Sequence, residues 1–126
     1  MISSLDHIQI AMPAGKESQA RQYYGELLGL KELEKPEPLR SRGGCWFELA
    51  NAGLHLGVEK DFLPAKKAHP AFRVSNLNKL AELFLKKGFI VTWDKNLKGE
   101  RRFYSEDIFG NRLEYMQDKS FAQDIL

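Results

Sequence analysis

The clearest indication of the fold lies near the C-terminus, in the stretch DIFGNRLEYMQ, residues 107–117. Residues 107–110 have the composition of a turn, and residues 112–117 alternate between polar and apolar, which predicts a strand. Because neighbouring side chains on a strand point to opposite faces, Leu113 and Tyr115 share an apolar face. Glu114 lies on the opposite, polar face.

The elements before this strand follow a simple order. Residues 68–74 read as a strand, and apolar positions from Leu77 to Phe84 at helical spacing predict a helix. Either Ser75 or Asn76 is suited to cap its start, and Gly88 to end it. Two further strands are expected at residues 89–93 and 102–106.

The first half of the chain predicts the same order. A strand is expected at residues 5–11, and a helix at 16–28 that ends at Gly29. Three strands follow at 31–35, 45–50 and 54–59, with a Pro-, Arg- and Gly-rich stretch at 36–44. From Gly29 to His55 is 26 positions, as it is from Gly88 to Glu114. The equal spacing indicates an internal repeat.

The order strand–helix–three strands, repeated, predicts an α+β fold of two tandem βαβββ modules. We expect a single domain over residues 1–126. Its first module covers about residues 3–60, a linker 60–67, the second module 68–117 and a C-terminal tail 118–126.

Composition excludes several classes of protein. Hydrophobic residues make up 43% of the 126 and charged residues 29%, which is typical of a globular chain. A net charge of +2 with interspersed signs favours neither nucleic acid nor a membrane surface as partner. The single cysteine, Cys45, excludes an intrachain disulfide and a cysteine zinc site. No signal peptide or membrane span is visible, so we expect a cytoplasmic location.

The three histidines, His7, His55 and His69, fall on the polar faces of their strands, as Glu114 does. A sheet curved around that side would bring the four together. Imidazole and carboxylate are ligands for Zn²⁺, Ni²⁺, Co²⁺, Fe²⁺ or Mn²⁺, so the pattern predicts a site for one divalent metal. A single histidine on such a face more often meets only water, and the prediction therefore depends on all four positions.

Other polar-face residues are candidates for binding a substrate. Arg73 and Arg112 are suited to bind a carboxylate or phosphate, although ion pairs with Glu48 or Glu59 are an alternative. Only one of the adjacent pair Arg101 and Arg102 can face the site.

Aromatic and polar groups complete the candidate set. Trp46 would form an aromatic wall, and Tyr104 is a candidate acid, base or anion donor. Gln9 follows His7 by two positions and shares its face. Cys45 alternates onto the apolar face, which indicates a buried, inert thiol.

These residues carry a resemblance to a known family, the vicinal oxygen chelate superfamily, which includes glyoxalase I, bleomycin-resistance proteins, fosfomycin-resistance transferases and type I extradiol dioxygenases. The matching pieces cover about residues 3–117. They are LDHI from Leu5, ARQYY from Ala20, LGL from Leu28, LHLGV from Leu54, HPAFRV from His69 and DIFGNRLE from Asp107.

The resemblance implies paired βαβββ modules whose sheets curve into a cup around a metal. By family position the metal ligands would be His7, His55, His69 and Glu114. We expect either Glu114 or Glu59 to act as the base. Ile108 stands where the family has a proline. His55 stands where a glyoxalase carries Glu or His, which leaves fewer carboxylates to act as base.

The resemblance therefore favours a glyoxalase-like, metal-dependent enzyme that acts on an oxygen-rich small molecule by isomerisation, lyase or transfer chemistry. Two alternatives stay open: a non-catalytic drug- or metabolite-binding protein, and an extradiol-type dioxygenase. The resemblance also implies a homodimer, whose modules pair either within one chain or between chains, so His7 and His69 would meet in one subunit or across two.

Overall fold

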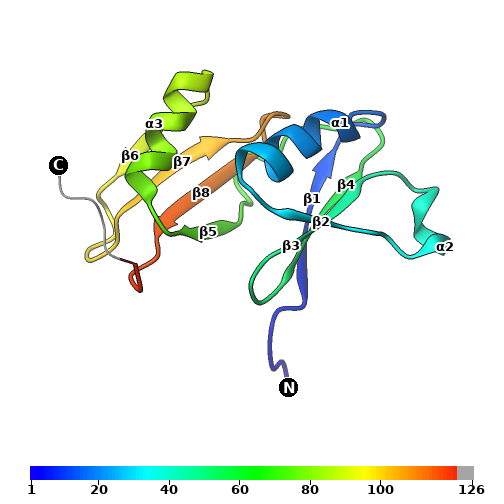
Figure 1. The fold of residues 1–126 in the computed structure, drawn as a ribbon, viewed down its shortest axis with the longest axis horizontal. Helices are drawn as coiled ribbons and strands as arrows, with labels where there is room; N and C mark the ends of the chain where they lie inside the picture. The colour runs from blue at the N-terminus through cyan, green and yellow to red at the C-terminus, as the bar shows by residue number, and fades with distance from the viewer. Residues whose placement is uncertain (122–126) are drawn as a thin grey trace. The chain divides into compact units, whose positions relative to one another are not determined.

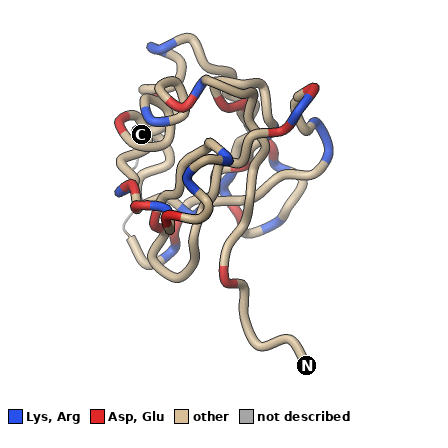
Figure 2. The backbone as a smooth tube through the Cα atoms, turned by 90° about the vertical axis from the view of Figure 1, so that its right-hand side faces the viewer, with Lys and Arg blue, Asp and Glu red and all other residues tan. Residues whose placement is uncertain are grey.

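The computed structural model describes residues 1–121. The chain divides into two compact units, one of residues Met1–Pro64 and one that begins at Ala65 (Figure 1). No helix within residues 1–121 is both long and apolar enough to cross a membrane. Basic and acidic residues are both scattered along the backbone, as their interspersed order in the sequence predicts (Figure 2).

The first unit is a four-stranded sheet in the order β1-β4-β3-β2. Its strands are β1 (His7–Met12), β2 (Lys31–Leu33), β3 (Cys45–Glu48) and β4 (Gly53–Val58), and its helices are α1 (Glu17–Ala20), η1 (Arg21–Leu27) and α2 (Glu37–Arg40). β1 pairs with β4 in parallel, and the other pairs are antiparallel. The buried ring of Tyr24 packs against that of Phe47, which fixes the helix on the apolar face of the sheet.

The helices of this unit differ from the prediction in two places. The single helix expected at 16–28 begins as α1 and continues as a π-helix, η1, in which the Leu28 amide donates to the Tyr23 carbonyl at 3.0 Å. Its wider turn accompanies the burial of two bulky neighbours, Tyr23 and Tyr24. The expected irregular stretch at 36–44 contains one helical turn, α2, with Pro38 in its first turn, where a proline is tolerated.

The second unit repeats the arrangement, with strand order β5-β8-β7-β6. Its elements are β5 (Ala71–Val74), α3 (Leu77–Lys87), β6 (Thr92–Asp94), β7 (Arg102–Glu106) and β8 (Arg112–Gln117). Asn76 caps α3 by accepting from the Lys79 amide at 3.1 Å, and Gly88 ends it at a φ of +87°. The predicted bounds of β7 and β8 are confirmed. β5 starts later than predicted, so His69 lies just before the strand.

An aromatic core holds α3 on its sheet. The ring of Phe84 meets those of Phe103 and Tyr115 at centroid distances of 5.8 and 5.3 Å. All three side chains are buried, and full burial of such a ring contributes about 2–3 kcal/mol. The predicted apolar face of β8 is therefore the core face, which leaves Glu114 on the other side of the sheet.

The turn before β8 is built around one buried carboxylate. Asp107 accepts from the backbone amides of Phe109 and Asn111, each at 2.9 Å, and from the Asn111 side chain at 3.0 Å. The Asn111 amide oxygen in turn accepts from the Ala65 backbone at 3.0 Å. Ile108 is exposed in this turn. The hydrogen bonds of Asp107 hold the turn without the proline that the family has at this position.

The strand registers give the repeat a residue-by-residue form. Gln9 and Trp46 lie opposite His55, and Ala71 and Tyr104 lie opposite Glu114. His7 precedes Gln9 by two residues, as His69 precedes Ala71. Three pairs therefore occupy equivalent positions: His7 and His69, His55 and Glu114, Trp46 and Tyr104. The fold class predicted from sequence, α+β with two tandem βαβββ modules, is confirmed.

Candidate functional site

The predicted metal ligands form two clusters, one in each unit. In the first unit three rings stack in a row: Trp46 lies 3.9 Å from His55 at an interplanar angle of 3°, and His7 lies 4.3 Å from His55 at 17°. We call these residues the ring stack. They belong to three neighbouring strands, because β4 lies between β1 and β3 and the register aligns Trp46 with His55.

Two glycines make room for the ring stack. A Cβ atom at Gly53 would lie 3.2 Å from His55 Nε2 and from His7 Cβ. A Cβ at Gly57 would lie 2.7 Å from the side-chain amide of Gln9. A Cβ at Gly57 would displace the Gln9 amide, and one at Gly53 would press on His7 and His55.

The histidines of the ring stack are suited to act as ligands. His7 Nδ1 lies 2.8 Å from a carboxylate oxygen of Asp6, which places the proton on Nδ1 and the lone pair on Nε2. Burial, followed by the neighbouring His7, lowers the pKa of His55. His55 is therefore neutral at pH 7, the form that offers a lone pair.

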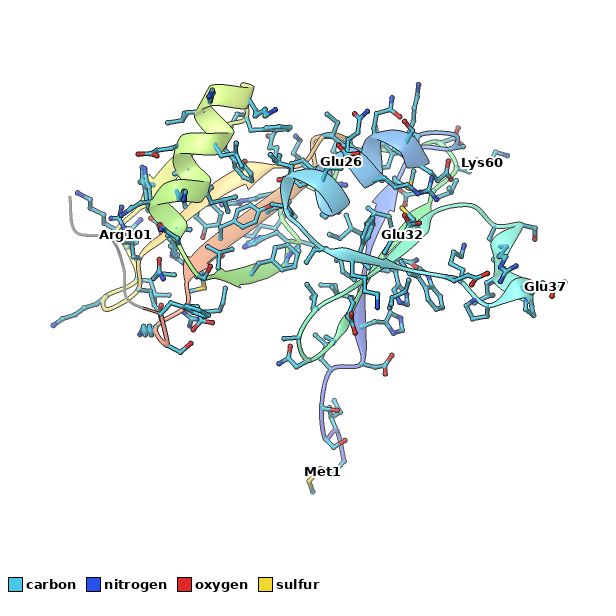
Figure 3. All side chains as sticks on the ribbon, in the orientation of Figure 1. Met1, Glu26, Glu32, Glu37, Lys60 and Arg101 are labelled. Carbon is cyan, nitrogen blue, oxygen red and sulfur yellow. The ribbon has the colours of Figure 1, made fainter. Side chains whose placement is uncertain are left out.

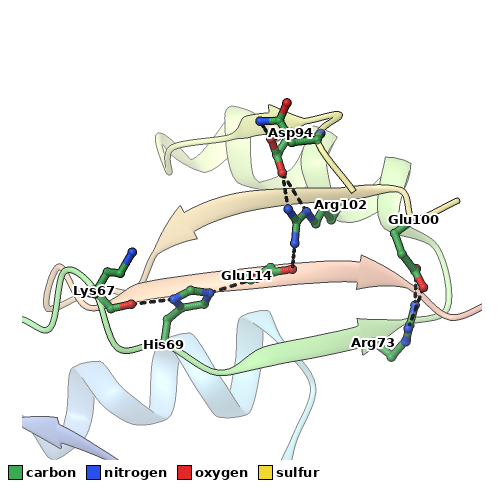
Figure 4. A network of polar contacts seen from close by, with 8 residues as sticks. Lys67, His69, Arg73, Asp94, Glu100, Arg102 and Glu114 are labelled. Carbon is green, nitrogen blue, oxygen red and sulfur yellow. Dashed lines mark hydrogen bonds and ion pairs between the residues drawn. The ribbon is translucent and has the colours of Figure 1, made fainter. Parts of the chain in front are cut away.

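The second unit carries a charged cluster, which we call the carboxylate network: His69, Asp94, Arg102 and Glu114 (Figure 4). Glu114 Oε1 lies 3.0 Å from His69 Nε2, and Glu114 Oε2 accepts from Arg102 at 3.0 Å. The other side of the Arg102 guanidinium donates to Asp94, at 2.9 Å from Nε and 2.5 Å from Nη2.

The contacts of His69 indicate that a cation belongs beside it. Its Nδ1 lies 2.8 Å from the Lys67 carbonyl, which can only accept, so Nδ1 carries a proton. Nε2 faces the Glu114 carboxylate, a second acceptor. Two acceptors facing each other at 3.0 Å need a proton or a metal ion between them. If a metal ion were bound here, His69 Nε2 and Glu114 Oε1 would be the atoms to hold it.

The carboxylate network and the ring stack each supply two of the four predicted ligands. Within residues 1–121 no three His, Cys, Asp or Glu side chains gather closely enough to hold a metal ion. The four-residue ligand set, and the cup that would assemble it, therefore stay predictions.

The structure separates the candidate arginines. Arg73 forms two hydrogen bonds with Glu100, at 2.8 and 3.1 Å, and donates to the Gln117 carbonyl. The sequence had suggested Glu48 or Glu59 as its partner. Arg112 instead lies over the ring of Tyr104, 4.2 Å from its centroid, and forms no ion pair with any residue of the described chain.

Of the adjacent pair, Arg102 is the arginine that faces Glu114. Arg101 lies over the Trp93 ring at 4.2 Å and hydrogen-bonds to Asn78 of α3, on the helix side of the sheet (Figure 3). The sequence had left open which of the two arginines faces the site. The alternation of Arg102 with Tyr104 on one strand is the signal that identifies it.

The two candidate bases lie in different settings. Glu114 is buried in the carboxylate network, whereas Glu59 is exposed and follows the last residue of β4. Glu59 lies four residues beyond His55, about 13 Å along an extended chain. Cys45 is buried as predicted, and burial raises the pKa of its thiol to about 11.

Comparison with solved structures finds a similar chain of related sequence. A glyoxalase family protein from Bacillus anthracis is 46% identical, with 94% of this chain and 98% of that one covered and a TM-score of 0.89. No protein-family model matches the chain, and no curated protein matches it.

Two more distant structures share the fold. A lactoylglutathione lyase from Agrobacterium tumefaciens is 15% identical over 96% of this chain and 98% of that one, with a TM-score of 0.71. TnmS3, an antibiotic binding protein from Streptomyces sp. CB03234, is 18% identical over 94% and 98%, with a TM-score of 0.70. At these identities the likeness concerns the fold alone.

Proposed function

Because the chain belongs to the glyoxalase family of the vicinal oxygen chelate superfamily, we propose that it is a divalent-metal-dependent enzyme that binds an oxygen-rich small molecule. The observation that carries the proposal is the contact between His69 and Glu114. Their facing acceptors at 3.0 Å require a cation, and a metal ion suits the imidazole and carboxylate donors.

The proposed ligands are His7, His69 and Glu114, with His55 as a fourth ligand or a close neighbour of the ion. The set takes Nε2 of His7 from one unit and the His69–Glu114 pair from the other. A metal held there would act as a Lewis acid that polarises a substrate oxygen. Imidazole and carboxylate accept Zn²⁺, Ni²⁺, Co²⁺, Mn²⁺ or Fe²⁺, so the ion is named only by class.

Glu114 is the better placed of the two proposed bases. Its Oε1 lies beside His69 on the ligand side of the sheet, so Glu114 would have to release the metal ion in order to take a proton on that oxygen. Glu59 lies beyond the end of β4 and far along the strand from His55. Isomerisation, lyase and transfer reactions all suit a polarised oxygen and one nearby carboxylate.

The substrate we propose is anionic. Arg112 lies on the same strand as Glu114, two residues away, so both side chains occupy one face. Its guanidinium is held over Tyr104 with no carboxylate partner in the described chain, and is therefore available to a carboxylate or phosphate. Arg73 is already paired with Glu100. In the first unit, Gln9 and Trp46 supply an amide and a flat apolar ring.

The ring stack favours a second candidate, a protein that binds a drug or metabolite without turnover. Three parallel rings offer a surface on which a planar ligand can stack. The antibiotic binding protein TnmS3 shares the fold. In this case the cation between His69 and Glu114 would be a proton.

Elemental analysis of untagged protein tests the proposal. We expect about one divalent metal per chain in the wild type and none in the triple variant His7→Ala, His69→Ala, Glu114→Ala. Glu106→Ala is the matched control, because Glu106 lies on the neighbouring strand and pairs with Lys66 outside both clusters. If the wild type contains no metal and added metal does not change its melting temperature, the second candidate, a protein that binds a ligand without turnover, is favoured.

The proposed assembly is a homodimer in the cytoplasm. Light scattering after size-exclusion chromatography tests it, since the chain is 14.5 kDa and a dimer has twice that mass. A monomer at micromolar concentration would contradict it.

A further inference from the structure

Arg102 joins the two carboxylates of the carboxylate network. Two of its nitrogens donate to Asp94 and the third donates to Glu114 Oε2 (Figure 4). The side chains are 16% (Arg102), 14% (Asp94) and 7% (Glu114) exposed, so water does not screen these contacts as it does at the surface.

The sheet register sets this geometry. Asp94 on the edge strand β6 lies directly opposite Arg102 on β7. Arg102 lies opposite Met116 on β8, and Glu114 is two residues away on the same face. The guanidinium is planar and rigid, so its contact with Asp94 fixes the direction of the remaining nitrogen. The hydrogen bond from Arg102 lowers the pKa of Asp94, which keeps this carboxylate charged.

We propose that Arg102, oriented by Asp94, is a positioning residue: it occupies Glu114 Oε2 and leaves Oε1 as the one oxygen available to a metal. The inference rests on the proposed function, because it concerns how Glu114 serves as a ligand. A carboxylate held in this way binds through a single oxygen, and its direction is set before the ion arrives.

The first unit supports the positioning role of Arg102, because it has no arginine at the equivalent position. The register of β3 and β4 places Gly44 where β7 carries Arg102, since Cys45 lies opposite Leu56 and the next pair along is Gly44 and Gly57. The residue at the position equivalent to Glu114 is His55, whose ring carries no oxygen for an arginine to occupy. The arginine occurs only in the unit whose ligand is a carboxylate.

Metal affinity distinguishes positioning from a purely structural ion pair. We would titrate metal-free full-length protein with Zn²⁺ against a chromophoric chelator, and record the visible spectrum of the Co²⁺ form. The variants are Asp94→Asn, Arg102→Lys and Arg102→Gln. The matched controls are Glu100→Gln and Arg73→Lys, which disrupt a second, more exposed arginine–carboxylate pair of the same unit.

We expect Asp94→Asn, Arg102→Lys and Arg102→Gln to bind Zn²⁺ about 10- to 100-fold more weakly, and the controls to stay within about twofold of the wild type. The Co²⁺ spectrum should change in the three variants, as Glu114 gains freedom to bind through both oxygens. Thermal unfolding of the metal-free proteins shows which variants are folded. Asp94→Asn is the smallest structural change among the three, because it keeps the size of the side chain.

The direction in which Arg102→Gln changes the metal affinity decides between the two explanations. If Arg102 acted only through its charge, removing it would strengthen binding of a cation, and Arg102→Lys would change nothing. Unchanged or tighter binding in both Arg102 variants, with an unchanged Co²⁺ spectrum, would overturn the inference and leave the proposed function in place. A wild type that binds no metal would overturn both.

Discussion

At the residue scale, burial and charge act in opposite directions on two ionisable groups. Burial raises the pKa of the Cys45 thiol to about 11, since the neighbouring core disfavours the thiolate. Hydrogen bonds, first from Arg73 and then from Lys119, lower the pKa of Glu100 to about 2. Neither group belongs to the candidate site. Their pKa values therefore affect the free energy of unfolding and not the proposed chemistry.

The Cys45 thiol should be unreactive in the folded protein. At pH 8 we expect an aromatic disulfide reagent to modify it only at the rate of unfolding, and at once in guanidinium chloride. Because its folded pKa lies above the unfolded value of 9.0, its contribution to the free energy of unfolding is complete below pH 9 and is lost as the pH rises toward 11. Rapid modification of the native protein would show that Cys45 is accessible.

Glu100→Gln should change acid stability. The folded pKa of Glu100 lies below the unfolded value of 4.5, so its stabilising effect is present above pH 4.5 and is lost as the pH falls toward 2. Urea midpoints between pH 2 and pH 6 should therefore depend less on pH in the variant than in the wild type. Glu37→Gln, at the exposed start of α2, serves as the control. Parallel curves for all three proteins would contradict the prediction.

At the element scale, the start of β3 depends on one glycine. Gly44 has a φ of +82°, and a Cβ there would lie 2.1 Å from the Leu56 carbonyl oxygen, which belongs to the paired strand β4. Backbone cannot move aside as a flexible side chain can. The close approach also keeps Trp46, two residues on, in register with His55.

Gly44→Ala should therefore cost more than about 4 kcal/mol or prevent folding. Gly99→Ala is the matched control, since Gly99 has the same φ of +82° but nothing within 4 Å of a Cβ, and should cost about 1–2 kcal/mol. Denaturant unfolding of both variants measures the difference. Equal costs would show that the backbone angle alone matters at Gly44.

At the scale of the whole molecule, the proposed ligand set spans both units, whose sheets share one topology. A metal that took donors from only one unit would stabilise that unit alone. One that took His7 together with Glu114 would couple the two. Metal binding is therefore a test of how the halves of the chain act together.

Zn²⁺ at 100 times its dissociation constant should stabilise the protein by about 2.7 kcal/mol and raise its melting temperature by about 10 °C. Hydrogen exchange should slow in strands of both units, including β1 and β8, and a chelator should reverse both effects. Mg²⁺, which prefers oxygen ligands, is the control. Slower exchange in the second unit only would remove His7 and His55 from the ligand set.

Much of the fold could be predicted because its signals are local. The alternation of residues 112–117, the Asn76 cap and the left-handed Gly88 each act within a few residues, and the structure confirms them. The spacing of 26 positions in each half predicted that His55 and Glu114 are equivalent, and the strand registers agree. The π-helix η1 was not predictable, since two buried tyrosines fit an α-helical pattern equally well.

The sequence by itself determined which faces of β1, β4 and β8 carry His7, His55 and Glu114, because the period of a strand fixes that face wherever the strand pairs. Only the tertiary structure decided their partners: that Arg102 meets Glu114, that Arg73 meets Glu100, and that His55 lies between Trp46 and His7. The physical reason is that each of these contacts joins residues from different strands or from a strand and a loop. They depend on register, which the pairing of whole strands sets.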